Sequence, residues 1–155
     1  MIRLNLGSAG MRFPGVYGFD RLLVNDPDGH RVDCVCNLEE DWPIKDNSVD
    51  ELLARHCFEH LSKPFHTMKE LYRVLKPGGN AAIVVPSTNG MGAFQDPDHK
   101  SFWNLNSFIY YDAEKREGKA YGTNLFQIVE LCEKSIRSFQ ISDPYVYAQI
   151  RKPVP

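Results

Sequence analysis

The chain has 155 residues, of which 43% are hydrophobic and 25% charged, and its formal net charge at pH 7 is −2. This length suits one domain, residues 1–155, with a buried core, and the charge gives no indication of nucleic-acid binding. The four cysteines include no C-x-x-C pair, which argues against a disulfide framework and a zinc ribbon. Without an evident signal peptide or membrane span, we expect a cytoplasmic protein.

Five predicted strands occupy much of the chain before residue 90. They are the ranges 2–6, 16–19, 31–36, 49–54 and 81–85. Only nine residues, 7–15, separate the first two strands, and ten, 21–30, separate the second from the third. A parallel crossover that includes a helix takes a dozen residues or more. We therefore expect the first crossovers to be abbreviated, and the first of them to be mostly loop.

Two helices are predicted between and after these strands. The first has Ser62 as its N-cap and Pro64 in its first turn, and its apolar face comprises Phe65, Met68, Leu71, Tyr72 and Leu75. The second has Leu125, Ile128, Val129, Cys132 and Ile136 on one face. A hairpin with a turn at Asp143-Pro144 and a strand over 146–150 closes the chain. This alternation predicts an α/β fold with a mostly parallel sheet.

A glycine-containing turn, Gly7 to Gly10, follows the first predicted strand. Open α/β sheets bind ligands at the carboxyl ends of their strands, and glycine lets the backbone approach a ligand closely. Asp20 ends the second strand, where it is placed to accept both hydroxyls of a ribose, and Asn37 follows the third, facing an adenine edge. The dinucleotide fingerprint is not met, because Ala9 and Arg12 stand where glycines belong. Taken alone, the turn also fits a plain connection.

The run His56-Cys57-Phe58-Glu59-His60 spells H-x-x-E-H, an inverted zinc-protease signature. A zinc peptidase needs both histidines on one long helix and a third ligand from a later segment. Here a strand precedes the run and Pro64 follows it closely, which leaves room for a turn or two. Zinc remains an alternative with His99 as third ligand, but we assign no metal. Glu59 and His60 either shape a cleft floor or are satisfied polar residues.

Several stretches of the sequence resemble the class I S-adenosylmethionine-dependent methyltransferases. They are "LNLGSAG", "FPGVYGFD", "DCVCNLEEDWPIKDNSVDELLARHCFEHL", "ELYRVLKPGGNAAIVVPS" and "DPDHKSF", within residues 2–110. The chain is most similar to the small branch resembling methyltransferase domain 11. The resemblance implies a Rossmann-like sheet of seven strands in the order 3-2-1-4-5-7-6, with the last strand inserted antiparallel. It also implies S-adenosylmethionine as the cofactor.

The same resemblance implies cofactor-binding residues along the strand ends. The methionine moiety would meet Gly7, Ser8 and Ala9, the ribose Asp20, the adenine Asn37 and Leu38, and the methionine end Arg55 and His56. The family usually has glycine at the position of Ala9 and commonly has aspartate at that of Asn37. We therefore expect a cofactor site of this type with an altered turn and an altered adenine contact.

Methyl transfer from a sulfonium is an in-line displacement, for which positioning of the acceptor supplies much of the catalysis. A base is needed only for a protonated acceptor, and histidine suits that role because its ordinary pKa is about 6.5. We predict His99 and His56 as the catalytic residues. The acceptor is a small molecule or a sugar, lipid or protein group.

Two other functions remain open at this stage. One is a non-catalytic cofactor- or protein-binding module of the same fold, which the short crossovers and Ala9 favour. The other is a zinc hydrolase that uses the H-x-x-E-H run.

Overall fold

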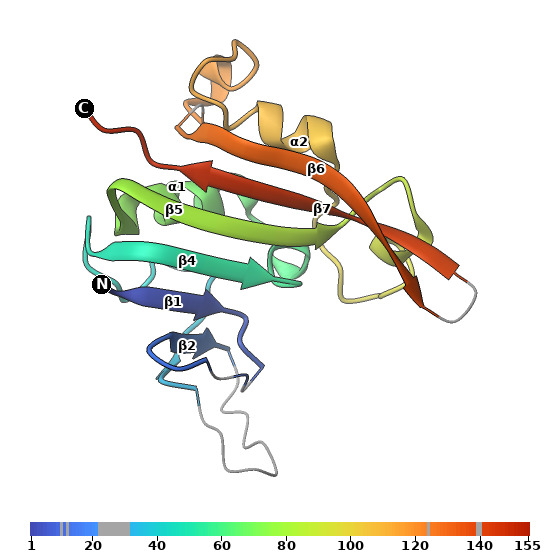
Figure 1. The fold of residues 1–155 in the computed structure, drawn as a ribbon, viewed down its shortest axis with the longest axis horizontal. Helices are drawn as coiled ribbons and strands as arrows, with labels where there is room; N and C mark the ends of the chain where they lie inside the picture. The colour runs from blue at the N-terminus through green and yellow to red at the C-terminus, as the bar shows by residue number, and fades with distance from the viewer. Residues whose placement is uncertain (10, 12, 22–31, 124, 139–140) are drawn as a thin grey trace.

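The computed structural model describes residues 1–155 except 10, 12, 22–31, 124 and 139–140. Its centre is a seven-stranded sheet in the order β3-β2-β1-β4-β5-β7-β6 (Figure 1). The strands are β1 (Arg3–Leu6), β2 (Tyr17–Asp20), β3 (Cys34–Val35), β4 (Val49–Arg55), β5 (Leu75–Pro86), β6 (Gln127–Ser138) and β7 (Ile141–Arg151). The first five run parallel, and β7 lies antiparallel between β5 and β6. This confirms the predicted fold class and strand order.

Two α-helices pack on the same side of the sheet, behind it in Figure 1. They are α1 (Pro64–Val74) and α2 (Leu105–Ile109), and the 3-10 turns are η1 (Phe58–His60), η2 (Met91–Ala93) and η3 (Lys119–Tyr121). Pro64 opens α1 as predicted, but the N-cap is Lys63 and makes no side-chain capping bond. The prediction of Ser62 as the N-cap is therefore wrong. Its hydroxyl donates a hydrogen bond to the Glu39 carboxylate at 2.6 Å and not to the first turn of α1.

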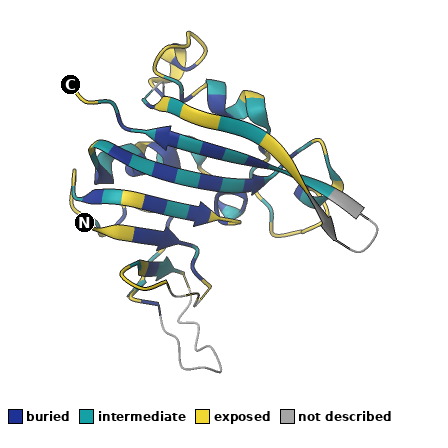
Figure 2. Cartoon of the chain, in the orientation of Figure 1, coloured by how far each residue is buried: buried dark blue, intermediate teal, exposed yellow. Residues whose placement is uncertain are grey.

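The two faces of the sheet differ in how far they are covered. Along β5, Ala81, Ile83 and Val85 are buried beneath the helices, while Ala82 and Val84 between them are only half-buried. Figure 2 shows the same alternation of buried and half-buried residues along β7. The core therefore lies on the helical side, and the described residues leave the opposite face of the central strands partly open.

The connection from β1 to β2 contains no helix in its described residues, which confirms the expected loop. The connection from β2 to β3 falls almost wholly within 22–31, so the expectation for it lies outside the described residues. The strand predicted over 31–36 is shorter in the structure, where β3 is Cys34–Val35.

The predicted second helix over residues 125–136 is wrong, because this segment forms β6. Its apolar residues do fall at helical spacing, but the segment pairs antiparallel with β7 from Gln127 to Ser138. A register shift between Ile128 and Glu130 disturbs the two-residue alternation that would have indicated a strand. Pairing with the next strand along the chain, β7, therefore outweighed the local pattern.

The predicted turn at Asp143-Pro144 is also wrong, because both residues lie inside β7. The carbonyl of Pro144 accepts a hydrogen bond from the Ser87 N–H at 3.0 Å. In an antiparallel strand, the nitrogen and the carbonyl of one residue point to the same side, so the nitrogen of Pro144 also faces Ser87. That side faces the chain just beyond Pro86, where β5 ends. The missing N–H of Pro144 therefore costs no bond to the strand ladder of β5.

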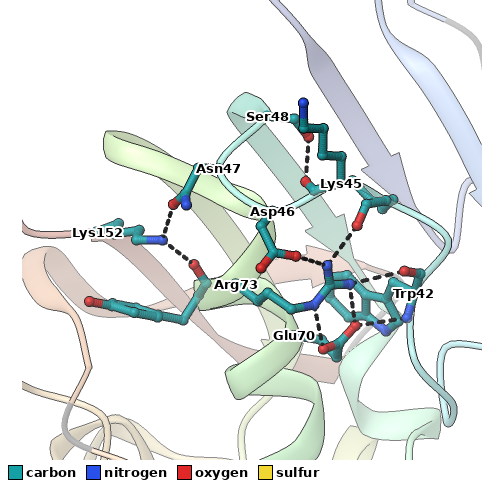
Figure 3. A network of polar contacts seen from close by, with 10 residues as sticks. Trp42, Lys45, Asp46, Asn47, Ser48, Glu70, Arg73 and Lys152 are labelled. Atoms are coloured by element: carbon teal, nitrogen blue, oxygen red, sulfur yellow. Dashed lines mark hydrogen bonds and ion pairs between the residues drawn. The ribbon is translucent and has the colours of Figure 1, made fainter.

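A polar network joins α1 to the connection that precedes β4 (Figure 3). Arg73 donates to Glu70 at 2.6 Å and to Asp46 at 2.5 Å, and Glu70 accepts from the Trp42 N–H at 2.7 Å. Burial opposes ionisation of Glu70, but these bonds and the Arg73 charge hold its pKa below the ordinary value. Nearby, Lys152 donates to the Asn47 side chain at 2.6 Å. The network fixes the connection from which a wall of the functional site is built.

Candidate functional site

The carboxyl ends of β1, β2 and β4 surround a cavity of about 240 Å³, which we call the first cavity. The sheet order reverses at β1, and ligands of open α/β sheets bind at this point. Six of the eight predicted cofactor-binding residues line it: Gly7, Ala9, Asp20, Asn37, Leu38 and His56. The structure therefore brings these six residues together, and their assignment to a cofactor stays a prediction.

The turn after β1 takes its shape from two residues with left-handed backbone. Gly7 has a φ of 63°, and a Cβ there would lie 2.7 Å from the Cβ of Cys57, so the position requires glycine. Ala9 has a φ of 46°, a conformation that costs a non-glycine residue about 1–2 kcal/mol. Its N–H donates to Asp20 Oδ2 at 2.8 Å, which ties the turn to the end of β2.

The other two predicted cofactor-binding residues, Ser8 and Arg55, are not among the residues that line the first cavity. Ser8 is 1% exposed, and its Oγ has no hydrogen-bond partner. A Cβ at Gly18 would lie 3.0 Å from that oxygen, so Ser8 packs against β2 beneath the turn. Arg55 ends β4 as an exposed residue.

Hydrogen bonds hold the segment that was predicted to contact adenine, Asn37 and Leu38. Asn37 Oδ1 accepts from the Glu39 N–H at 3.1 Å, and Asn37 Nδ2 donates to Glu40 at 3.1 Å, which together make a local turn. Leu38 is buried, and its carbonyl accepts from the Trp42 indole at 3.1 Å. This bond connects the apolar wall of the cavity to the network around Arg73 and α1.

Four charged residues of the first cavity were not among the predicted cofactor-binding residues: Arg21, Glu39, Asp98 and Lys100. Burial opposes ionisation of Glu39, but hydrogen bonds from Ser62 and the charges of Lys100 and Lys63 hold its pKa below the ordinary value. Lys100 Nζ lies 3.7 Å from Glu39 Oε1. The "DPDHK" stretch resembled a family motif, but the resemblance did not predict that Asp98 and Lys100 line the first cavity.

A second cavity of about 410 Å³ adjoins the first and shares His56 and His60 with it. It also has Glu59 and His99 in its wall, together with residues of η2 and the start of β7. The N–H groups of Lys100 and Ser101 donate to the Glu59 carbonyl at 2.7 and 3.0 Å. These bonds bring His99 beside His60. The predicted catalytic residues His56 and His99 therefore both line the second cavity.

The H-x-x-E-H run does not form the helix of a zinc peptidase. His56 has a left-handed φ of 49°, and Phe58 to His60 form the 3-10 turn η1, so His56 and His60 do not share a helical face. Instead, His56 Nδ1 lies 3.2 Å from Glu59 Oε1. Glu59 is 2% exposed, and its Oε2 has no hydrogen-bond partner. The run turns the chain from β4 into the wall of the second cavity.

Comparison with known proteins agrees with the observed fold. Residues 19–83 match the family model described as a methyltransferase domain. Over 68 residues the chain is 35% identical to malonyl-[acyl-carrier protein] O-methyltransferase of Brevibacillus brevis, which aligns 44% of this chain and 23% of that one. Residues 19–83 of the chain are therefore similar to a methyltransferase domain.

Solved methyltransferase structures share the fold over nearly the whole chain. A methyltransferase from Methanosarcina mazei has a TM-score of 0.68 at 14% identity, covering 99% of this chain and 92% of that one. The 1,6-didemethyltoxoflavin-N1-methyltransferase of Burkholderia thailandensis, solved with S-adenosylhomocysteine, has a TM-score of 0.66 at 15% identity, covering 98% and 71%. The alignments to curated relatives span only 20% to 31% of their lengths. The sequence similarity is therefore to part of each curated relative, and not to its whole length.

Within the part of the chain that the structure describes, none of the helices has the length and apolar character needed to cross a membrane.

Proposed function

We propose that this methyltransferase domain binds S-adenosylmethionine in the first cavity and transfers its methyl group to an acceptor held in the second. One observation supports this above all: the glycine turn, Asp20 and Leu38 line a single cavity at the edge where the sheet order reverses. The bound cofactor supplies a methyl group on a sulfonium. The residues of the chain hold and orient the two reactants.

The residues present fit such a cofactor. The Asp20 carboxylate stands where a ribose would need an acceptor for its hydroxyls, and Leu38 provides an apolar wall for a base. At Gly7 a side chain would collide with Cys57, so the turn stays narrow where the methionine moiety would pass. The solved Burkholderia enzyme, whose fold this chain shares, carries S-adenosylhomocysteine.

His56 lies where the proposed cofactor and acceptor would meet, because it is in the walls of both cavities. Its side chain is 43% exposed, and its Nδ1 faces Glu59 Oε1 at 3.2 Å. A carboxylate in this position holds a proton on Nδ1 and leaves Nε2 to accept a proton from an acceptor hydroxyl or ammonium. His56 is therefore our proposed base, and His99 a wall residue of the acceptor side.

The experiment is a calorimetric titration of the purified chain with S-adenosylhomocysteine. Binding in the micromolar range supports the cofactor site and justifies assays with acceptors that carry hydroxyl, amine or carboxyl groups. Absence of both heat and thermal stabilisation at millimolar ligand would contradict the proposal. That outcome would favour a non-catalytic module of the same fold, consistent with the short first crossover and with Ala9.

A further inference from the structure

The second cavity contains a group of side chains that methyl transfer does not require. Glu59, His60 and His99 each offer one ligand atom, and these atoms lie within 4.8 Å of one another. Ligand atoms bonded at about 2.1 Å to one tetrahedral zinc lie about 3.4 Å apart, so side-chain rotations that close about 1.4 Å would bring the three atoms into range. The second cavity thus brings two imidazoles and a carboxylate to one point.

Each histidine of the group presents its Nε2. His60 Nδ1 lies 3.1 Å from Asp98 Oδ2, and His99 Nδ1 lies 2.9 Å from the Ala93 carbonyl oxygen. A carbonyl can only accept, so His99 carries its proton on Nδ1 and offers the lone pair of Nε2. Metal-bound histidines typically donate their other ring N–H to a carboxylate or backbone carbonyl in this way. The nearest carboxylate to His99 Nε2, on Asp96, is 3.9 Å away.

The carboxylate of the group points to a missing ligand. Glu59 is only 2% exposed, and its Oε2 has no hydrogen-bond partner. Its other oxygen, Oε1, already faces His56 Nδ1. A buried carboxylate oxygen without a partner carries a desolvation penalty. A cation at the point shared with His60 and His99 would remove that penalty.

From these observations we propose that Glu59, His60 and His99 bind a divalent transition metal, with zinc as the type ion, in the wall of the second cavity. The assignment replaces our expectation of no metal, and it differs from the protease pattern because Glu59 takes the place of His56 as a ligand. Two histidines and one carboxylate form a ligand set that zinc and iron accept, and three protein ligands leave coordination positions open. If the proposed methyl transfer is right, an acceptor oxygen or nitrogen would bind there.

The test is a titration of the tag-free, chelator-stripped chain with zinc chloride by calorimetry. We expect one equivalent of zinc to bind, and we expect Glu59→Gln and His99→Ala each to weaken binding at least tenfold. Asp98→Asn, which removes the carboxylate beside His60 Nδ1, should weaken binding about 10–100-fold. His66→Ala removes a histidine of α1 outside the cavity and should leave zinc binding unchanged.

Cobalt substitution adds a second readout, because the visible absorption of bound Co²⁺ should be lost in His99→Ala and retained in His66→Ala. Zinc that fails to bind the wild type, or binds Glu59→Gln and His99→Ala as tightly as the wild type, would overturn the proposal. Circular dichroism shows whether each variant is folded. If one of Glu59→Gln and His99→Ala does not fold, the zinc affinity of the other variant tests the proposal. Repeating the titration with S-adenosylhomocysteine present separates the two proposals, since either ligand can bind while the other fails.

Discussion

The two cavities of this domain share His56 and His60 but differ in the parts of the chain that form them. The first is formed mainly by strand ends and a left-handed turn, with the carboxylates of Asp20, Glu39 and Asp98 in its wall. The second is formed by imidazole and carboxylate side chains that two long-range backbone bonds to the Glu59 carbonyl bring together. This difference teaches that backbone shape defines the site for the expected cofactor, whereas side-chain chemistry defines the site for its partner. Changes in backbone geometry should therefore damage the first cavity most.

The largest effect is expected from Gly7→Ala. The new Cβ would lie 2.7 Å from Cys57 Cβ in a left-handed conformation, so overpacking of about 1–3 kcal/mol adds to backbone strain of about 1–3 kcal/mol. Gly15→Ala is the matched control, since its φ is 72° but a Cβ there meets nothing within 4 Å. Urea denaturation should show a loss for Gly7→Ala well above the loss for Gly15→Ala. Equal losses would mean that strain alone, and not the contact with Cys57, matters at this turn.

A smaller effect is expected from Asp20→Ala on the binding of S-adenosylhomocysteine. Loss of hydrogen bonds to a charged group costs about 1.5–3 kcal/mol, which corresponds to roughly a 10–100-fold weaker affinity. The exposed Asp41→Ala, outside the cavity, should bind like the wild type. Calorimetry measures both, and unchanged affinity in Asp20→Ala would remove the ribose assignment. Because Asp20 also accepts from the Ala9 N–H, circular dichroism must show that the variant is folded.

The smallest effect is expected from Glu39→Gln, which removes an acid from the rim of the first cavity. Because the pKa of Glu39 is lowered in the folded state, its contribution is complete above the unfolded pKa of about 4.3 and disappears as the pH falls through the folded pKa. We expect a loss of less than about 1 kcal/mol at neutral pH.

Urea denaturation at neutral and acidic pH checks this prediction. The difference in stability between Glu39→Gln and the wild type should vanish in acid, where both carry a neutral side chain. A difference that stays constant with pH would show that packing, and not charge, explains it. The exposed Glu114→Gln serves as the control.

Six residues of the first cavity were predictable from the sequence because they lie at strand ends or shortly after them. Asp20 and His56 come at or immediately after β2 and β4, and parallel strands bring their carboxyl ends to one edge of the sheet. Glu39, Asp98 and Lys100 were missed because they come from loops. Their positions depend on bonds to other segments, such as that from Ser62 to Glu39, which no local pattern encodes.

The sequence by itself determined where β1, β2, β4 and α1 lie and which turn must carry glycine, because hydrophobic period and steric limits act over a few residues. Only the tertiary structure decided that the segment from Gln127 to Ser138 is a strand, because β7 supplies its hydrogen-bond partners. In the same way it placed His99 beside His60, since backbone bonds join segments some forty residues apart. Both results depend on hydrogen bonds between separate segments, and the residue pattern within one segment does not encode them.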